Sequence, residues 1–167
     1  LKTSPNVSGG LESLVKLLPG VSSSNELSSQ YSVRGGNFDE NLVYVNDVEV
    51  YRPFLIRSAQ QEGLSFINPD MVGAVEFSSG GFTAEFGDKM SSVLNVRYRE
   101  PKANALRVSA GLLGASATLE GVAIGSSLTY MSGVRYKTSR YILNSLETKG
   151  DYTPSFFDWQ GIADYKL

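Results

Sequence analysis

Apolar residues recur at helical spacing in residues 11–18, near the start of the chain. The apolar positions there are Leu11, Leu14, Val15 and Leu18. This spacing predicts a short helix, and Pro19-Gly20 predict its end. Because so short a helix is unstable alone, we expect it to pack on a sheet. Residues 22–29 are mostly polar and predict a loop.

Short alternating runs replace the helical pattern after this loop. Two β-rich runs, 42–46 and 48–51, meet at Asn46-Asp47. Since asparagine and aspartate tolerate positive φ, this pair predicts the turn of a tight hairpin. Residues 57–66 are weakly helical. Asn68-Pro69-Asp70 has the cap residue and the first-position proline of a helix, which has room for one turn.

Two further strands complete this first part of the chain. Residues 74–77 predict a strand that ends at Gly80-Gly81, because paired glycines interrupt extended runs. Residues 92–99 alternate strictly, with apolar side chains on one face and asparagine and arginine on the other. Glu100-Pro101 ends this part.

The alternation is longer in the rest of the chain. Long dyad alternation with small and aromatic residues on the apolar face is typical of membrane-barrel strands, which need about 9–11 residues each. The phase changes at Leu112-Leu113, which indicates a bulge or a turn near Gly114. Three amphipathic strands of a soluble sandwich would give the same pattern, so periodicity leaves both interpretations open. The segments concerned are 105–120, 126–137 and 157–167.

Composition removes several classes of function. The formal net charge is −2 and no basic stripe exists, which argues against nucleic-acid binding. The chain has no cysteine and no histidine, so Ser-His-Asp, Cys-His and His-zinc chemistry is excluded. No apolar stretch is long enough for a transmembrane helix, and residues 1–10 lack the apolar core of a signal peptide. We expect the sequence to be an excised piece of a longer protein.

Several short elements between Leu17 and Pro101 occur in a recognisable order. They are Leu17-Leu18-Pro19-Gly20-Val21, Val33-Arg34-Gly35-Gly36, Asn41 to Val48, Pro69 to Glu76 with Gly80-Gly81, Ala84-Glu85-Phe86-Gly87, and Ser91 to Val96. In this order they resemble the plug of TonB-dependent outer-membrane receptors, in a variant common in the Bacteroidota. The resemblance implies an α+β fold with two parts. Residues 1–102 would form a plug with a small mixed β-sheet and short helices. Residues 103–167 would supply about the first three antiparallel strands of an incomplete outer-membrane β-barrel.

The resemblance also implies a function. The plug would sit in the barrel lumen of a bacterial outer membrane, reached from the periplasm. It would gate uptake of a scarce ligand such as a siderophore, a metal chelate or a glycan. The implied partners are TonB, through a box ahead of Leu1, and the remainder of the barrel. No enzymatic activity, cofactor or metal is implied. Because three strands cannot close a barrel, we expect the isolated chain to self-associate through 103–167.

Arg34 and Glu76 are the candidate contacts between plug and barrel. The alternatives are a solvated turn arginine and a solvent-facing partner in the alternation. Asn46 and Asp47 should form the hairpin turn. Ser79 stands where the family usually has an arginine before the glycine. We expect positive φ at five glycines of the motif turns, which are Gly35, Gly36, Gly80, Gly81 and Gly87.

Three other interpretations stay open on the residues. In the first interpretation, the chain is a soluble extracellular binding module. In the second, the adjacent carboxylates Asp39 and Glu40 perform hydrolysis, or bind calcium with Asp47, but neighbours in sequence diverge in direction and no calcium-loop spacing is present. The third concerns Tyr130, Tyr136, Tyr141 and Trp159, which form either an interfacial girdle or ordinary core packing.

Overall fold

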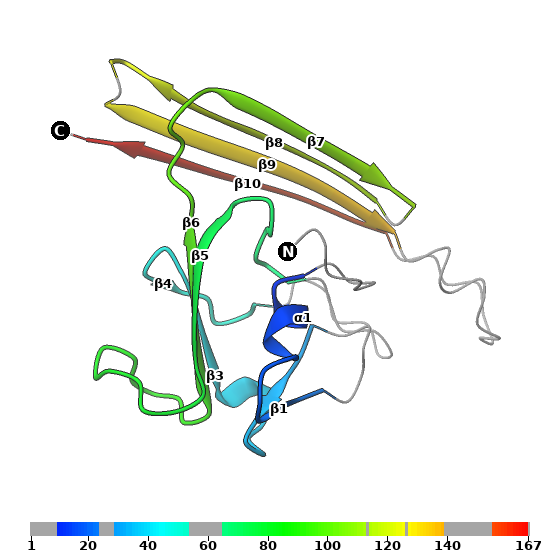
Figure 1. The fold of residues 1–167 in the computed structure, drawn as a ribbon, viewed down its shortest axis with the longest axis vertical. Helices are drawn as coiled ribbons and strands as arrows, with labels where there is room; N and C mark the ends of the chain where they lie inside the picture. Colours follow the sequence, from blue (N-terminus) through cyan, green and yellow to red (C-terminus); the bar gives the residue numbers. More distant parts are fainter. Residues whose placement is uncertain are drawn as a thin grey trace. The chain divides into compact units, whose positions relative to one another are not determined.

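The computed structural model describes residues 10–23, 29–53, 65–112, 114–125, 127–138 and 155–166. The chain divides into two compact units, Leu1–Arg99 and Glu100–Leu167, and each is described by itself. Most regular structure is β-sheet, in three separate sheets (Figure 1). The described residues contain no helix long and apolar enough to cross a membrane. The weakly helical segment 57–66 lies almost entirely outside the described ranges.

The first helix, α1 (Glu12–Val15), is shorter than the segment 11–18 that the spacing predicts. Its last i→i−4 bond joins Lys16 N–H to the Glu12 carbonyl, and the next two bonds, from Leu17 and Leu18, reach back only three residues. Pro19 disfavours helical backbone in the residue before it, so the chain tightens and leaves the helix early. As a result Leu18 is exposed, although the spacing predicts it on the apolar face.

A four-stranded sheet forms the centre of the first unit, in the order β4-β3-β6-β5. Its inner strands β3 and β6 are parallel, while β4 and β5 pair antiparallel at the edges. The first five residues of β6 are buried, so this strand is covered on both faces. The strands are β3 (Asn41–Val45), β4 (Val48–Glu49), β5 (Val72–Ser78) and β6 (Ser92–Tyr98).

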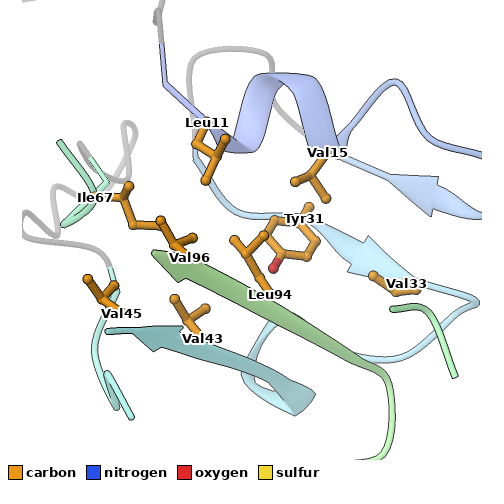
Figure 2. Packing of buried hydrophobic residues seen from close by; sticks show 9 residues of the cluster. All are labelled: Leu11, Val15, Tyr31, Val33, Val43, Val45, Ile67, Leu94 and Val96. Carbon is orange, nitrogen blue, oxygen red and sulfur yellow. The ribbon is translucent and has the colours of Figure 1, made fainter. Parts of the chain in front are cut away.

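The core lies between this sheet and the N-terminal elements. These elements are α1 and a two-stranded sheet of β1 (Val21–Ser22) and β2 (Ser32–Val33). The short 3-10 helix η1 (Phe38–Glu40) precedes β3 and contributes no buried residue. Figure 2 shows side chains of α1 and Tyr31 packed above Leu94 and Val96 of β6. The buried cluster comprises Leu11, Val15, Tyr31, Val33, Val43, Val45, Ile67, Leu94 and Val96.

The two turns at the end of β6 are built by asparagines. Asn46 and Asp47 join β3 to β4 with φ values of 49° and 62°, the left-handed pair of a tight hairpin. The helix predicted from Asn68 is a turn instead: the Met71 N–H donates to the Asn68 carbonyl at 3.0 Å, and the Asn68 side chain accepts the Asp70 N–H at 3.1 Å. No room for a helix exists there because β5 begins at Val72.

The second unit is an antiparallel meander in the order β10-β9-β8-β7 (Figure 1). The sequence predicts about three strands in this part, whereas the structure forms four. The reason is that β7 and β8 form a hairpin with Gly111 opposite Gly114, so of the bulge and the turn predicted near Gly114 the turn is correct. The strands are β7 (Ala105–Gly111), β8 (Gly114–Ala123), β9 (Leu128–Thr138) and β10 (Ser155–Tyr165).

Candidate functional site

Arg34 lies in the turn after β2, with its backbone in the left-handed region at φ 50°. Its backbone N–H donates to the Gly20 carbonyl at 2.8 Å. Its side chain extends over a second glycine turn, since a Cβ built at Gly80 would lie 3.3 Å from the guanidinium Nη1. The side chain is exposed, and no carboxylate in the described part of the chain forms an ion pair with it. The guanidinium of Arg34 is therefore an accessible positive charge next to the glycine turns at Gly20 and Gly80.

Glu76 lies on the edge strand β5, opposite Asn95 of β6. Its side chain is exposed, and Asn95 Nδ2 donates to its Oε2 at 3.4 Å. Within the described ranges, no hydrogen bond or ion pair joins Glu76 to Arg34. The structure thus presents these two charges separately.

The five motif glycines fall into two groups. Three have positive φ, at 82°, 141° and 69°; they are Gly35, Gly80 and Gly81. Gly36 and Gly87 do not have positive φ, contrary to the prediction. Gly36 is needed for space instead, because a Cβ there would overlap Ser91 Oγ. A Cβ at Gly87 would have no neighbour within 4 Å, and the positive φ of that turn falls on Asp88, at 75°.

The adjacent acids Asp39 and Glu40 both contact the segment before β6, Asp39 through its backbone carbonyl and Glu40 through its carboxylate. Lys89 Nζ donates to the Asp39 carbonyl, and Ser91 Oγ donates to Glu40 Oε2 at 3.0 Å. These contacts join the loop before β3 to the loop before β6. No group of three or more acidic side chains within the described ranges is placed to hold a metal ion. The geometry gives the Glu40 carboxylate a structural partner on a second loop.

A buried carboxylate lies within the core of the first unit. Glu12 of α1 is 2% exposed, and Ser65 Oγ donates to its Oε1. Burial, together with the nearby charge of Glu12, raises the pKa of the Tyr31 hydroxyl above its usual range. A charged residue inside an apolar helix segment gives no signal of burial in a single sequence, so sequence analysis missed Glu12.

One face of the four-stranded meander is apolar across all its strands. Cross-strand partners lie on the same face, so the registers place every second residue together. Many of these side chains are exposed, as Val108 at 70% and Trp159 at 66% illustrate. The face comprises Leu106, Val108, Ala110, Leu112, Ala115, Ala117, Leu119, Gly121, Ala123, Leu128, Tyr130, Ser132, Val134, Tyr136, Phe157, Trp159, Gly161, Ala163 and Tyr165. We call this set the apolar face.

The opposite face carries the charged residues of these strands, and four of them form two ion pairs. Arg135 of β9 forms a bidentate ion pair with Asp158 of β10, with Nε–Oδ1 and Nη2–Oδ2 distances of 2.7 and 2.8 Å. Gln160 Nε2 also donates to Asp158, at 3.1 Å. Arg107 pairs with Glu120 at 2.6 Å. The sheet is therefore two-faced, with paired charges on one side and apolar groups on the other. The alternation signalled the two faces, but nothing local signalled the pairs.

Comparison with known proteins adds one finding. The family model described as TonB-dependent Receptor Plug Domain matches residues 4–93, more than half of the chain. No curated protein and no solved structure matches the chain.

Proposed function

The chain belongs to the family of TonB-dependent receptor plug domains, and from this membership we propose that it gates uptake of a scarce ligand, such as a siderophore, a metal chelate or a glycan. Plugs of this family are gating elements of outer-membrane transporters rather than enzymes. The match over 4–93 carries the proposal, and it falls within the compact unit Leu1–Arg99. Residues 1–102 are accordingly proposed as the plug domain.

The second part of the proposal concerns 103–167, as strands of the barrel that surrounds the plug. A two-faced sheet supports it, because barrel strands need an apolar outer face and a polar inner face. Strands β8, β9 and β10 have 10, 11 and 11 residues, which is long enough to span a membrane. Each edge strand of this sheet, β7 and β10, pairs on one side only among the described residues. Further strands are needed to close the barrel, since unsatisfied edges are not tolerated in lipid.

Arg34 and Glu76 are proposed as contacts between plug and barrel wall. Both side chains are exposed, so their charges are accessible to a surrounding surface. A wall carboxylate would suit Arg34, and a wall cation would suit Glu76. Enclosure in the lumen lowers the effective dielectric, which makes such pairs stronger than ordinary surface pairs and makes their loss more costly.

TonB is proposed as the energy-coupling partner. It would engage a segment on the N-terminal side of the plug, from the periplasm. The first elements of the chain, α1 and the two-stranded sheet of β1 and β2, are then the first to receive the pull. These elements are small and attach to the central sheet through the core cluster.

Deleting residues 10–98 tests the gate. We expect the deletion to admit a large hydrophilic antibiotic that the outer membrane normally excludes, and to abolish energy-dependent ligand uptake. The amount of protein in the outer membrane is measured alongside, so that loss of the protein is not mistaken for a closed gate. Unchanged antibiotic entry, with normal amounts of membrane-inserted protein, would refute the proposal.

The alternative of a soluble extracellular binding module is weaker. A soluble module would have to expose the whole apolar face to water, and patches of more than a few hundred Å² are rare on soluble monomers. A transport role leaves that surface in lipid. Solubility of the protein without detergent at high concentration would favour the alternative.

A further inference from the structure

Helix α1 carries an acidic side chain at a position that faces the core. Glu12 is 2% exposed, which is as deeply buried as Leu11 and Val15 of the core cluster (Figure 2). Glu12 and Val15 lie three residues apart, so their side chains share the face of the helix that packs on the core. Helix α1 therefore docks through a face that is partly polar.

Two polar side chains inside the core lie next to the Glu12 carboxylate. Ser65 Oγ donates a hydrogen bond to Glu12 Oε1 and accepts the backbone N–H of Ile67 at 3.0 Å. Tyr31 is buried close enough to Glu12 that, after burial itself, the charge of Glu12 raises the pKa of its hydroxyl. Tyr31 immediately precedes β2, and Ser65 lies in the segment before β5. Glu12 thus joins α1 to two other segments through polar contacts.

Burial of a carboxyl group is costly even when the group has partners. The water that solvates both carboxyl oxygens of an undocked helix is lost on docking, and hydrogen bonds inside the core replace it only in part. An unbranched apolar side chain of similar length would gain free energy from the same burial. Since apolar replacement of buried charged groups is often neutral or stabilising, Glu12 makes the docking of α1 weaker than the surrounding packing allows.

The rest of the N-terminal layer is also held by few backbone contacts. The strand that follows α1 pairs with β2 through two residues, Val21 and Ser22, and the Arg34 N–H donates to the Gly20 carbonyl. Strand β6, by contrast, pairs with β3 on one edge and with β5 on the other. Elements with few contacts open at a lower free energy than the central strands of a fold. The first unit therefore combines a weakly held helix with a firmly held sheet.

We propose that Glu12 is a release residue: it keeps the docking of α1 weak enough for a pull from the N-terminal side to free this helix while the central sheet stays folded. The proposal rests on the gating role proposed above, and it names the residue that sets how readily the gate responds. A carboxyl group suits this task because it is hydrogen-bonded while the helix is docked and fully solvated once the helix leaves. Stability is given up at this position in favour of release.

Hydrogen exchange in the intact protein tests the weak docking without any transport. The Lys16 N–H bonds to the Glu12 carbonyl within α1, so its exchange rate reports opening of the helix. Glu12→Met puts an apolar side chain of similar length in the core and should slow this exchange about tenfold. Ser65→Ala removes the donor to Glu12 and should speed it about tenfold. The Tyr98 N–H at the end of β6 is the internal reference and should change in neither variant.

The opposite signs of these two effects make the exchange experiment decisive. Unchanged or faster exchange in Glu12→Met would overturn the proposal, because the carboxyl group would then strengthen the docking of α1. Failure of Glu12→Met to fold would overturn it for the same reason. Slower exchange in Ser65→Ala would show that the hydrogen bond to Glu12 does not hold the helix.

Cysteine labelling in cells tests whether the weak docking is used, since the chain has no cysteine of its own. Val15→Cys places a thiol at a position that is 3% exposed, where a small polar maleimide can react only after α1 leaves the core. We expect about tenfold faster labelling in cells with TonB than in cells without it. Leu94→Cys, at a buried position of β6, should stay unlabelled in both. Equal labelling of Val15→Cys with and without TonB would overturn the proposal.

Two variants at position 12 connect this release to the carboxyl group. Adding Glu12→Met to Val15→Cys should abolish most of the TonB-dependent labelling, because α1 is then docked too firmly. Glu12→Gln is the matched control, since it keeps the length of the side chain and an acceptor for Ser65 Oγ. Its amide also loses water on docking, so TonB-dependent labelling should persist. Equal loss or equal retention in the two variants would overturn the role of Glu12.

These outcomes are separable from the result of the plug deletion. Labelling that is independent of TonB, together with a leaky deletion of residues 10–98, would condemn the release of α1 alone. The expected exchange and labelling, together with a deletion that does not leak, would condemn the gate alone.

Discussion

The side-chain oxygen of Asn46 accepts the backbone N–H of Tyr98 at 2.8 Å, and the Asn46 N–H donates to Val96 at 2.9 Å. The hairpin turn is thereby fixed to the end of a strand fifty-two residues further along the chain. Asn46 therefore supplies both the left-handed backbone of the turn and a hydrogen bond to the last residue of β6.

Replacing Asn46 with alanine should lower the free energy of unfolding by about 1–3 kcal/mol. The substitution removes the hydrogen bond to Tyr98. It also places alanine, which has no polar side chain to stabilise left-handed backbone, at φ 49°. Urea unfolding followed by circular dichroism measures the change. Asp47→Gly is the matched control: at φ 62° glycine is unstrained, so stability should stay equal or rise by up to about 1 kcal/mol. An equally damaging Asp47→Gly would contradict the account.

Gly36→Ala should destabilise the first unit by more than about 1 kcal/mol, because the new methyl overlaps Ser91 Oγ and lies 2.7 Å from Glu40 Oε2. Gly87→Ala has open space and an ordinary φ, so it should change stability by less than about 0.5 kcal/mol. The same urea titration compares the two. Similar losses at both positions would show that close approach is not the reason for glycine at 36.

Alkaline pH should weaken the fold through Tyr31. Its pKa is raised in the folded state by burial and by Glu12. Below an unfolded pKa of about 10 the hydroxyl is neutral in both states, and its contribution is intact. As pH rises further, the unfolded chain ionises first, so the free energy of unfolding falls by up to about 1.4 kcal/mol per pH unit. Tyr31→Phe removes this ionisation, so the slope of the free energy of unfolding against pH should lose the contribution of about one proton. If the free energies of unfolding of the unmodified protein and of Tyr31→Phe fall in parallel from pH 9 to 11, the effect is refuted.

Arg34→Gln should separate gating from folding. The side chain is exposed, so the free energy of unfolding should change by less than about 0.5 kcal/mol. Loss of the proposed contact with the wall should nevertheless raise passive antibiotic entry several-fold. Arg52→Gln, another exposed arginine, should alter neither quantity. Equal permeability of the two variants would remove Arg34 from the plug–wall interface.

The isolated chain should self-associate through its second unit. Among the described residues, strands β7 and β10 each pair with a neighbouring strand on one side only, and open edges recruit other chains. Light scattering during size-exclusion chromatography should show oligomers that grow with concentration. A chain ending at residue 102 should lack this association. Monomeric behaviour of the 167-residue chain at all concentrations would contradict the prediction.

Strands of the first unit were accessible to sequence reasoning because their signals are local. Alternation and β-branched residues located β3, β5 and β6 to within two residues, and Asn46-Asp47 located the hairpin turn. The parallel pairing of β3 with β6 was not accessible, since nothing within a strand specifies its distant partner. Burial of β6 on both faces follows from that pairing.

The misjudged features have different physical causes. Apolar spacing continued to Leu18, but the following proline ended α1 at Val15. Gly36 looked like a turn glycine, whereas its role is set by Ser91, fifty-five residues away. Segment 105–120 was counted as one strand although its phase change allowed either a bulge or a turn, and the pairing of β7 with β8 shows that the turn is correct. Of these features, only the role of Gly36 depends on a contact far along the chain.

The parallel pair of β3 and β6 also constrains biosynthesis. Strand β3 has β4 as a hairpin partner, but its other edge pairs only when Asn41 meets Ser92, and closing so long a loop slows folding. A nascent chain therefore travels toward its compartment with its most apolar runs unprotected until β6 has emerged. We expect such a chain to depend on a holding chaperone during export, and any truncation before residue 92 to leave material that cannot mature.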